Sequence, residues 1–430
     1  MTSAIEQGIR YAGEVEILFI EVYSHKKEKI DILPQMVEMS IFEDIFSNSI
    51  HGSLIVSDSY DLIFNFPFIG EELIKIKLRT PSMGDAGTVE YEGYIYKISD
   101  RHQTTERGQV YTIHFTSLET IIDVNKKVSK VFDGNVTDIV RSIVKDDDLL
   151  GSQKEFVAEK AGNNLKFVSP YWNPLKTINW LSMRALNRQN NSPTFVFYET
   201  LDNKFKFVSL DTLYSQTPKP GINYKYDSFL RETSATGSTK NIEREYNLIR
   251  DYYVDEVFDY ITRSETGMYA SKLINTNIVS KTIKTTSRDY LKDFANTNHL
   301  GKYPVASNGL LRRSGAAVFT VNNAEYVYDG QRDMRVEQWM TQRKSLIGQA
   351  LNIFKMDIVV SGRLDVHAGD CVMAEINQLQ PINRGDDKSQ IVNGYFSGKF
   401  LIGAIHHRFE GNNHTMIMQC FTESLSKELQ

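Results

Sequence analysis

The sequence predicts a mainly β protein with α+β insertions, in which two antiparallel β domains near the ends of the chain are joined by mixed α+β segments. Two observations predict this class. Short segments rich in Ile, Val, Phe and Tyr, separated by turn-forming residues, dominate residues 14–117 and return after residue 351. Between these regions, apolar residues recur at helical spacing in several places.

The first β domain is predicted over residues 1–124. Within it, Tyr94, Tyr96 and Ile98 are expected on one face of a strand, because side chains alternate along a strand. Regular strand spacing favours an antiparallel barrel or sandwich. The predicted strands cover residues 14–23, 52–57, 72–79, 89–99 and 110–116, with turns at 24–29 and 81–87.

A small α+β domain is predicted over residues 125–225. Asn135 and Asn173 are each placed to cap a helix, and Pro174 fits the first turn of the second one. The helices are predicted over residues 136–145 and 174–186, and a β-hairpin follows with strands over 194–199 and 204–209.

A mixed insertion over residues 226–350 is predicted next. Its Ser/Thr/Gly segment at 233–239 has the composition of a loop or linker, and its aromatic stretch at 246–260 fits a strand with a bend. A long helix is predicted near 333–350, since this stretch contains no proline. The second β domain then occupies residues 351–430.

The composition describes an ordinary folded protein. The 430 residues include 49 basic and 54 acidic ones, and the formal net charge is −5. This length predicts about three domains, and the absence of a basic excess disfavours a protein that grips duplex DNA. Two cysteines, Cys371 and Cys420, cannot form a disulfide framework. We predict no signal peptide, and no apolar run approaches the roughly 18 residues of a membrane span.

None of the residue spacings of a nucleophile elbow, a zinc-protease helix or a phosphate-binding loop occurs in the sequence. The nearest approach is residues 394–400, which have one residue too few between the glycines. Phe400 also stands where such a loop needs a hydroxyl. We therefore predict a glycine-containing turn that precedes a strand.

The densest group of metal-ligand residue types is His406, His407, His414 and Cys420. If residues 410–413 form a hairpin loop, His407 and His414 are diagonal neighbours on one face. His406 then points to the other face, and Cys420 lies about three residue pairs further along. A tetrahedral metal site needs more ligands than this face supplies, so structural histidines are expected.

The remaining polar clusters and tryptophans have structural interpretations. Glu43-Asp44 and the run 146–148 are expected to be solvated faces and helix ends, and Trp172, Trp180 and Trp339 core or interface residues. We therefore predict no catalytic, cofactor-binding or metal-binding residues and no cofactor. The sequence assigns no partner-interface residues.

Several short motifs follow one another along most of the chain, at 41–46, 52–59, 68–74, 173–175, 181–185, 195–199, 267–272, 359–362, 368–372, 397–402 and 405–409. Their order resembles that of the baseplate central hub proteins of contractile-tailed bacteriophages. These hubs are related to the hub portion of type VI secretion spike proteins. In the resemblance, the first three motifs and the last four lie in two β-barrels, and the others lie between them.

The resemblance implies a structural protein of the virion, located in the baseplate of the viral tail after synthesis in the host cytoplasm. Family hubs are homotrimers in which each chain supplies two tube-like antiparallel β-barrels. The resulting pseudo-hexameric ring connects the sixfold tail tube to the threefold central spike and surrounds the DNA channel.

The expected partners are therefore the tail tube protein, the central spike protein with any lytic domain, and other baseplate proteins. DNA is expected to pass through the channel without specific binding, which the net charge of −5 suits. The alternative is a cell-wall-degrading or carbohydrate-binding component of the tail tip. That alternative needs a pocket of converging carboxylates or an exposed aromatic platform.

Overall fold

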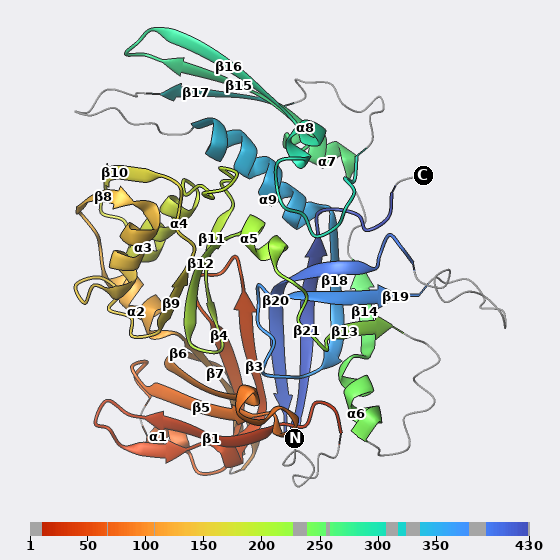
Figure 1. Cartoon of the computed structure of the whole chain (residues 1–430). Coiled ribbons are helices and arrows are strands. Elements are labelled where there is room, and N and C mark those ends of the chain that lie inside the picture. The colour runs from red at the N-terminus through yellow and green to blue at the C-terminus, as the bar shows by residue number, and fades with distance from the viewer. Residues whose placement is uncertain are drawn as a thin grey trace, which may run out of the picture.

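The computed structural model describes residues 11–66, 68–106, 108–226, 239–254, 259–306, 317–323, 336–377 and 393–428. One sheet of 13 strands runs through the molecule and contains strands from both predicted β regions (Figure 1). We call its N-terminal strands the first half-sheet and its C-terminal strands, with two strands from the middle of the chain, the second half-sheet.

The first half-sheet consists of β1 (Glu16–Tyr23), β2 (Lys29–Asp31), β3 (Met36–Asp44), β4 (His51–Asp58), β5 (Leu73–Arg79), β6 (Thr88–Thr105) and β7 (Gly108–Thr116), with short helical segments at Leu33–Gln35, Leu62–Asn65 (α1) and Pro81–Gly87. Every neighbouring pair is antiparallel, in the order β3-β4-β7-β6-β5-β1-β2. The alternation that predicts the strands also builds the core, since Ile74, Ile76 and Leu78 of β5 are fully buried.

The expected alternation in β6 is interrupted after Ile95. At this point β6 shifts its register against β7, so that Ile98 lies opposite Ile113 of the core. A bulge adds one residue to a strand and reverses the faces of the side chains that follow. Ile98 therefore shares the core face with Ile95, and the prediction that Tyr94, Tyr96 and Ile98 share one face is wrong.

The second half-sheet consists of β13 (Asn223–Tyr226), β14 (Ile249–Val254), β18 (Phe354–Ser361), β19 (Cys371–Ile376), β20 (Gly398–Glu410) and β21 (Asn413–Thr422). The order is β14-β18-β21-β20, and β19 pairs with both β20 and the parallel strand β13. A separate apolar core fills this half, in which Met356, Ile402 and Met418 are fully buried.

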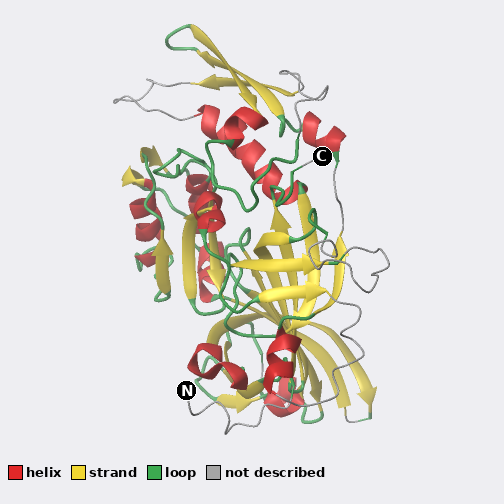
Figure 2. Cartoon of the chain, turned by 45° about the vertical axis from the view of Figure 1, so that its right-hand side comes forward, coloured by secondary structure: helices red, strands yellow, loops and turns green. Residues whose placement is uncertain are grey.

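The two half-sheets meet along β3 and β20, which pair antiparallel from Asp44 opposite Ala404 to Met39 opposite Phe409. We call this junction the seam. Figure 2 shows the strands of both halves continuing into one another through the middle of the molecule. Along the described strands the order ends at β2 and at β14. The mainly β class with α+β insertions is confirmed, but these strands form one sheet, and two separate closed barrels are not confirmed.

The predicted helix and hairpin unit lies beside the first half-sheet (Figure 1). It consists of α2 (Leu118–Asn125), β8 (Val131–Asn135), α3 (Val136–Lys145), β9 (Glu155–Ala158), β10 (Asn164–Val168), α4 (Pro174–Ser182), β11 (Phe195–Thr200), β12 (Lys204–Ser209) and α5 (Leu210–Ser215). Asn135 caps α3 as expected, by accepting a hydrogen bond from the Thr137 amide. The predicted hairpin is β11 and β12.

The capping prediction for α4 is wrong in its chemistry. The Asn173 side chain accepts no capping hydrogen bond. It instead donates to the Asp123 carbonyl oxygen at 2.6 Å, while the Asp123 carboxylate accepts from the Leu175 amide at 2.6 Å. The end of α2 therefore caps α4, a pairing that local sequence does not encode.

An arm of three strands projects from the body, with a long helix beneath it (Figure 1). The arm contains β15 (Ala270–Asn277), β16 (Thr282–Asp289) and β17 (Ala317–Asn323), and the insertion also contains α6 (Thr239–Tyr246), α7 (Tyr260–Glu265) and α8 (Tyr290–Phe294). The predicted long helix is present from residue 336, as a π-helical turn at Gln338–Gln342 followed by α9 (Arg343–Asn352).

Within the stretch 246–260, residues 249–254 form the strand β14, whose register against β18 shifts between Ile249 and Asp251. The stretch also contains the last residue of α6 and the first residue of α7, and residues 255–258 lie outside the described residues. Residues 233–238 of the expected loop, and residues 333–335 of the expected helix, lie outside the described residues. The division of the chain into domains at 1–124, 125–225, 226–350 and 351–430 stays a prediction.

Candidate functional site

A buried carboxylate, Glu43, joins three parts of the chain next to the seam. It lies on β3, and its side chain is completely shielded from solvent. Its oxygens accept hydrogen bonds from the backbone amides of Leu201 at 3.1 Å and Ala368 at 3.0 Å. The Nδ1 atom of His367 lies 3.2 Å from Oε1. The first half-sheet, the β11–β12 turn and the loop before β19 are therefore held at one point.

The charges at this junction stabilise one another. Burial by itself would raise the pKa of Glu43, but the charge and hydrogen bond of His367, followed by the nearby His407, hold that pKa far below its usual range. Burial would likewise lower the pKa of His367, yet the negative charge of Glu43 outweighs it and raises that pKa. We infer an ionised Glu43 beside a protonated His367.

Two further histidines extend the junction along the hairpin of β20 and β21. The Nε2 atom of His407 lies 3.4 Å from Glu43, and its Nδ1 atom lies 3.1 Å from Nε2 of His414. His414 stacks on Phe409, and burial followed by the charge of His407 lowers its pKa well below the usual value. A Cβ atom on Gly362 would lie 2.1 Å from the His414 ring, so this glycine makes room for it.

The predicted histidine arrangement is confirmed. Phe409 pairs with His414, and His407 and His414 share the buried face. His406 points the other way, where it stacks on Phe42. Cys420 pairs with Ile402, well along the ladder. Within the described ranges, no group of three or more His, Cys, Asp or Glu residues could hold a metal ion.

Glu43 itself was missed, because the pair Glu43-Asp44 is expected from sequence to be solvated. That prediction is wrong for Glu43, since strand alternation turns it into the core while Phe42 is 43% exposed. The cost of burying the charge is offset by partners that lie far away in sequence. The alternation Phe42-Glu43 was the available signal, but it does not say which of the two faces is covered.

A second buried ionic cluster joins the helix and hairpin unit to the first half-sheet. Lys154 Nζ lies 2.5 Å from Glu199 and 2.9 Å from Glu119. Glu199 also accepts hydrogen bonds from the Ile50 amide at 3.0 Å and the Ser117 hydroxyl at 2.6 Å. Burial raises the pKa of Glu199 despite Lys154, so this carboxylate depends on its cation.

The structure also shows where the predicted tryptophans, acidic run, glycine-containing turn and cysteines lie. The rings of Trp172 and Trp180 pack at a tilted angle of 54°, and the guanidinium of Arg184 lies 3.8 Å from the centre of the Trp180 ring and 4.7 Å from that of the Trp339 ring. Asp147 and Asp148 are exposed after α3, as expected. Residues 394–396 form a turn before β20, and both cysteines are buried and unpaired.

Comparison with known proteins finds a similar protein in a bacteriophage. A protein of Vibrio phage KVP40, described as "Probable baseplate hub protein gp334", is 21% identical over 408 residues, which cover 91% of this chain and 90% of that protein. The predicted resemblance to phage baseplate hub proteins is confirmed. No family model matches the chain.

Among solved structures, two tail proteins are similar to this chain in fold. The 43 kDa tail protein of prophage MuSo2 from Shewanella oneidensis has a TM-score of 0.56 at 9% identity, covering 94% of this chain and 98% of that protein. A tail protein from Neisseria meningitidis MC58 has a TM-score of 0.55 at 11% identity, covering 94% and 96%. Among the helices of the described residues, none has the length and apolar character to cross a membrane.

Replacing Glu43 by Gln tests the junction through its pH dependence. We expect the free energy of unfolding to fall by about 3–5 kcal/mol near pH 6, because the protonated His367 would lose its buried partner. In the wild-type protein, the contribution of Glu43 to the free energy of unfolding is present above its unfolded pKa of about 4.3 and falls as the pH drops below that value. That of His367 is present below about 6.5 and is lost as the pH rises through its raised folded pKa.

Denaturant unfolding of Glu43→Gln between pH 4 and pH 8 measures both slopes. The matched control is Glu90→Gln, whose carboxylate is 45% exposed beside Lys77, and for which a change under about 0.5 kcal/mol is expected. If Glu43→Gln unfolds like the wild-type protein at every pH, the electrostatic account of the junction is wrong.

Replacing Lys154 by Met tests the second cluster. The substitution leaves Glu119 and Glu199 buried without their cation, so we expect a loss of about 3–5 kcal/mol in the free energy of unfolding. Lys166→Met is the control, because its pair with Asp133 is about half exposed and is expected to contribute under about 0.5 kcal/mol. Equal effects of the two substitutions would contradict the assignment.

Proposed function

We propose that the chain is a structural hub protein of a bacteriophage tail baseplate. The observation that carries the proposal is the seam, which makes one sheet from two antiparallel half-sheets in a single chain. The Vibrio phage relative supports it, since its description names a baseplate hub protein. The fold shared with a prophage tail protein and with a tail protein from Neisseria meningitidis agrees with this role.

In the finer form of the proposal, three chains form a homotrimer and their half-sheets form a pseudo-hexameric ring. Each half-sheet then acts as one tube-like barrel unit, so that the ring presents sixfold symmetry to the tail tube and threefold symmetry to the central spike. This mechanism is geometric and needs the two halves of each chain to keep a fixed relation. The seam and the Glu43 junction support that rigidity.

The ring is proposed to surround the DNA channel of a contractile tail without binding the DNA specifically. Three ion pairs on the sheet surface support this, because a cation that is paired with a carboxylate is less available to phosphate. Lys75 pairs with Glu92, and Lys77 with Glu90 at 2.9 Å. Across the seam, Arg408 holds Glu38 through two hydrogen bonds of 3.0 Å each.

The proposed role is not enzymatic. The buried carboxylates Glu43, Glu119 and Glu199 are occupied by backbone amides, hydroxyls, His367 and Lys154. Such groups hold segments together, whereas acid–base chemistry needs a carboxyl that can reach a substrate. The proposed location is the virion baseplate, after synthesis in the host cytoplasm, with the tail tube, spike and other baseplate proteins as partners.

Light scattering of the purified chain, alone and with the spike and tube proteins of the same phage, tests the proposal. We expect a particle of three times the 49.3 kDa chain mass that binds both proteins. A reconstruction of that particle should contain a ring with pseudo-sixfold symmetry. Measurements over a range of concentrations separate a trimer from aggregates, and a chain that stays monomeric with both partners present would contradict the proposal.

A further inference from the structure

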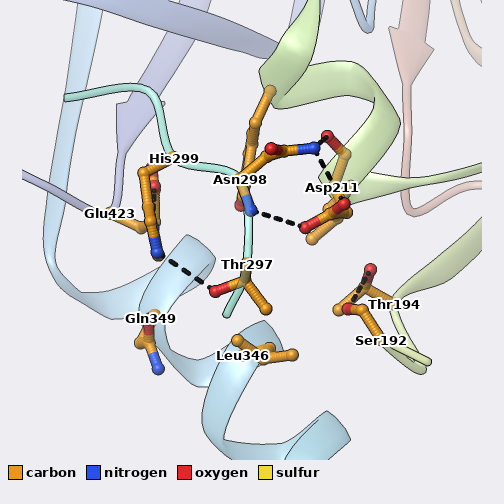
Figure 3. A pocket seen from close by; sticks show the side chains of 11 residues that line it. Ser192, Thr194, Asp211, Thr297, Asn298, His299, Leu346, Gln349 and Glu423 are labelled. Atoms are coloured by element: carbon orange, nitrogen blue, oxygen red, sulfur yellow. Dashed lines mark hydrogen bonds and ion pairs between the residues drawn. The ribbon is translucent and has the colours of Figure 1, made fainter. Parts of the chain in front are cut away.

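A small cavity lies where five segments of the chain meet (Figure 3). Asp211 and Tyr214 of α5 line it, together with residues of the segment after α8, Gln349 of α9 and Glu423 at the end of β21. In Figure 3, Gln349 lies on the helix below the cavity and Asp211 on the opposite side. Its volume is about 10 Å³, close to the least that can hold one water molecule.

Most polar atoms around the cavity are already bonded to protein. The Asp211 carboxylate accepts hydrogen bonds from the Asn298 amide at 2.8 Å and from its side chain at 3.0 Å. The Oε1 atom of Glu423 lies 2.9 Å from Nδ1 of His299 and accepts the Leu300 amide at 3.0 Å. Both oxygens of Asp211 and one oxygen of Glu423 thus fix the segment that follows α8.

Within the part of the chain that the structure describes, two buried polar atoms of the lining have no hydrogen-bond partner. They are the Oε2 atom of Glu423 and the hydroxyl of Tyr214. Glu423 is only 2% exposed and Tyr214 only 6% exposed. Leaving such groups unpaired would cost about 1–3 kcal/mol each, and more for a charged oxygen. Burial raises the pKa of Tyr214, and the negative charge of Glu423 raises that pKa further. The Tyr214 hydroxyl is therefore close enough to Glu423 to interact with its charge.

We propose that this cavity binds one ordered water molecule, which bridges the Glu423 carboxylate and the Tyr214 hydroxyl. The water donates one hydrogen to Oε2 of Glu423 and accepts the hydrogen of Tyr214. Its remaining capacity faces Gln349, which lines the same cavity. Buried waters make two to four such bonds to groups that the protein leaves unpaired. The cavity has room for about one water molecule, and both unpartnered atoms belong to side chains that line it.

The position of this water gives it a structural role. It connects α5 of the hairpin unit with the end of β21 in the second half-sheet. Glu423, which it holds, also fixes His299 and Leu300 in the segment that follows α8. The water therefore helps to fix the base of the arm against the body, independently of any partner that the chain binds.

A crystal structure of the full chain at about 1.5 Å resolution tests the proposal directly. We expect one density peak at hydrogen-bonding distance, roughly 2.6–3.2 Å, from both Glu423 Oε2 and the Tyr214 hydroxyl. An empty cavity, or a direct hydrogen bond between the two side chains, would overturn it. Crystals grown with rubidium ions provide the other decisive result, because an anomalous peak there would mean a cation in place of water.

Two variants test the water in solution. Tyr214→Phe removes one of its partners, so the midpoint of thermal unfolding should fall by about 2 °C, and amide exchange at Leu300 should rise about tenfold if one hydrogen bond's worth of stability is lost. Tyr224→Phe is the matched control, because its hydroxyl is also buried without a protein partner but lies outside this cavity's lining. Equal, negligible effects of both variants on Leu300 would count against the bridge.

Discussion

The structure depends on one buried charge, the carboxylate of Glu43. A carboxylate removed from water must be compensated by donors that are already in place, or the fold is destabilised by several kcal/mol. The donors come from the turn after β11 and from the loop before β19, through Leu201, His367 and Ala368. Satisfying this charge therefore requires the hairpin unit and both half-sheets to be correctly placed at the same time.

The seam turns that local requirement into a property of the whole chain. Because β3 and β20 pair along their length, two apolar cores that could belong to separate domains share one hydrogen-bonded sheet. The Lys154 cluster attaches the hairpin unit to the same sheet in a similar way. A rigid chain of this kind suits the proposed task of joining a sixfold tube to a threefold spike. A hinge between the two halves would let them move relative to each other, and the ring would no longer fit both partners.

Local patterns predicted much of this structure. The range and the cap of α3, the β11–β12 hairpin and the faces of His406, His407 and His414 all follow from short-range sequence patterns, and all are confirmed. The pairing of β3 with β20 was beyond reach, because strand periodicity does not specify a partner more than 350 residues away. The same limit applies to Glu43, whose inward orientation makes sense only once His367 is known to lie beside it.

Native-state hydrogen exchange along the seam tests the central claim most directly. Amides of β3 and β20 are compared with those of Ile113 in β7 and Ile358 in β18, which lie in the two cores. If the chain is one unit, all four sets exchange only through global unfolding. At each denaturant concentration the four sets then have equal opening free energies, and these values fall together as denaturant is added. Exchange of the seam at lower free energy, while both cores remain protected, would show two independent halves and contradict the account.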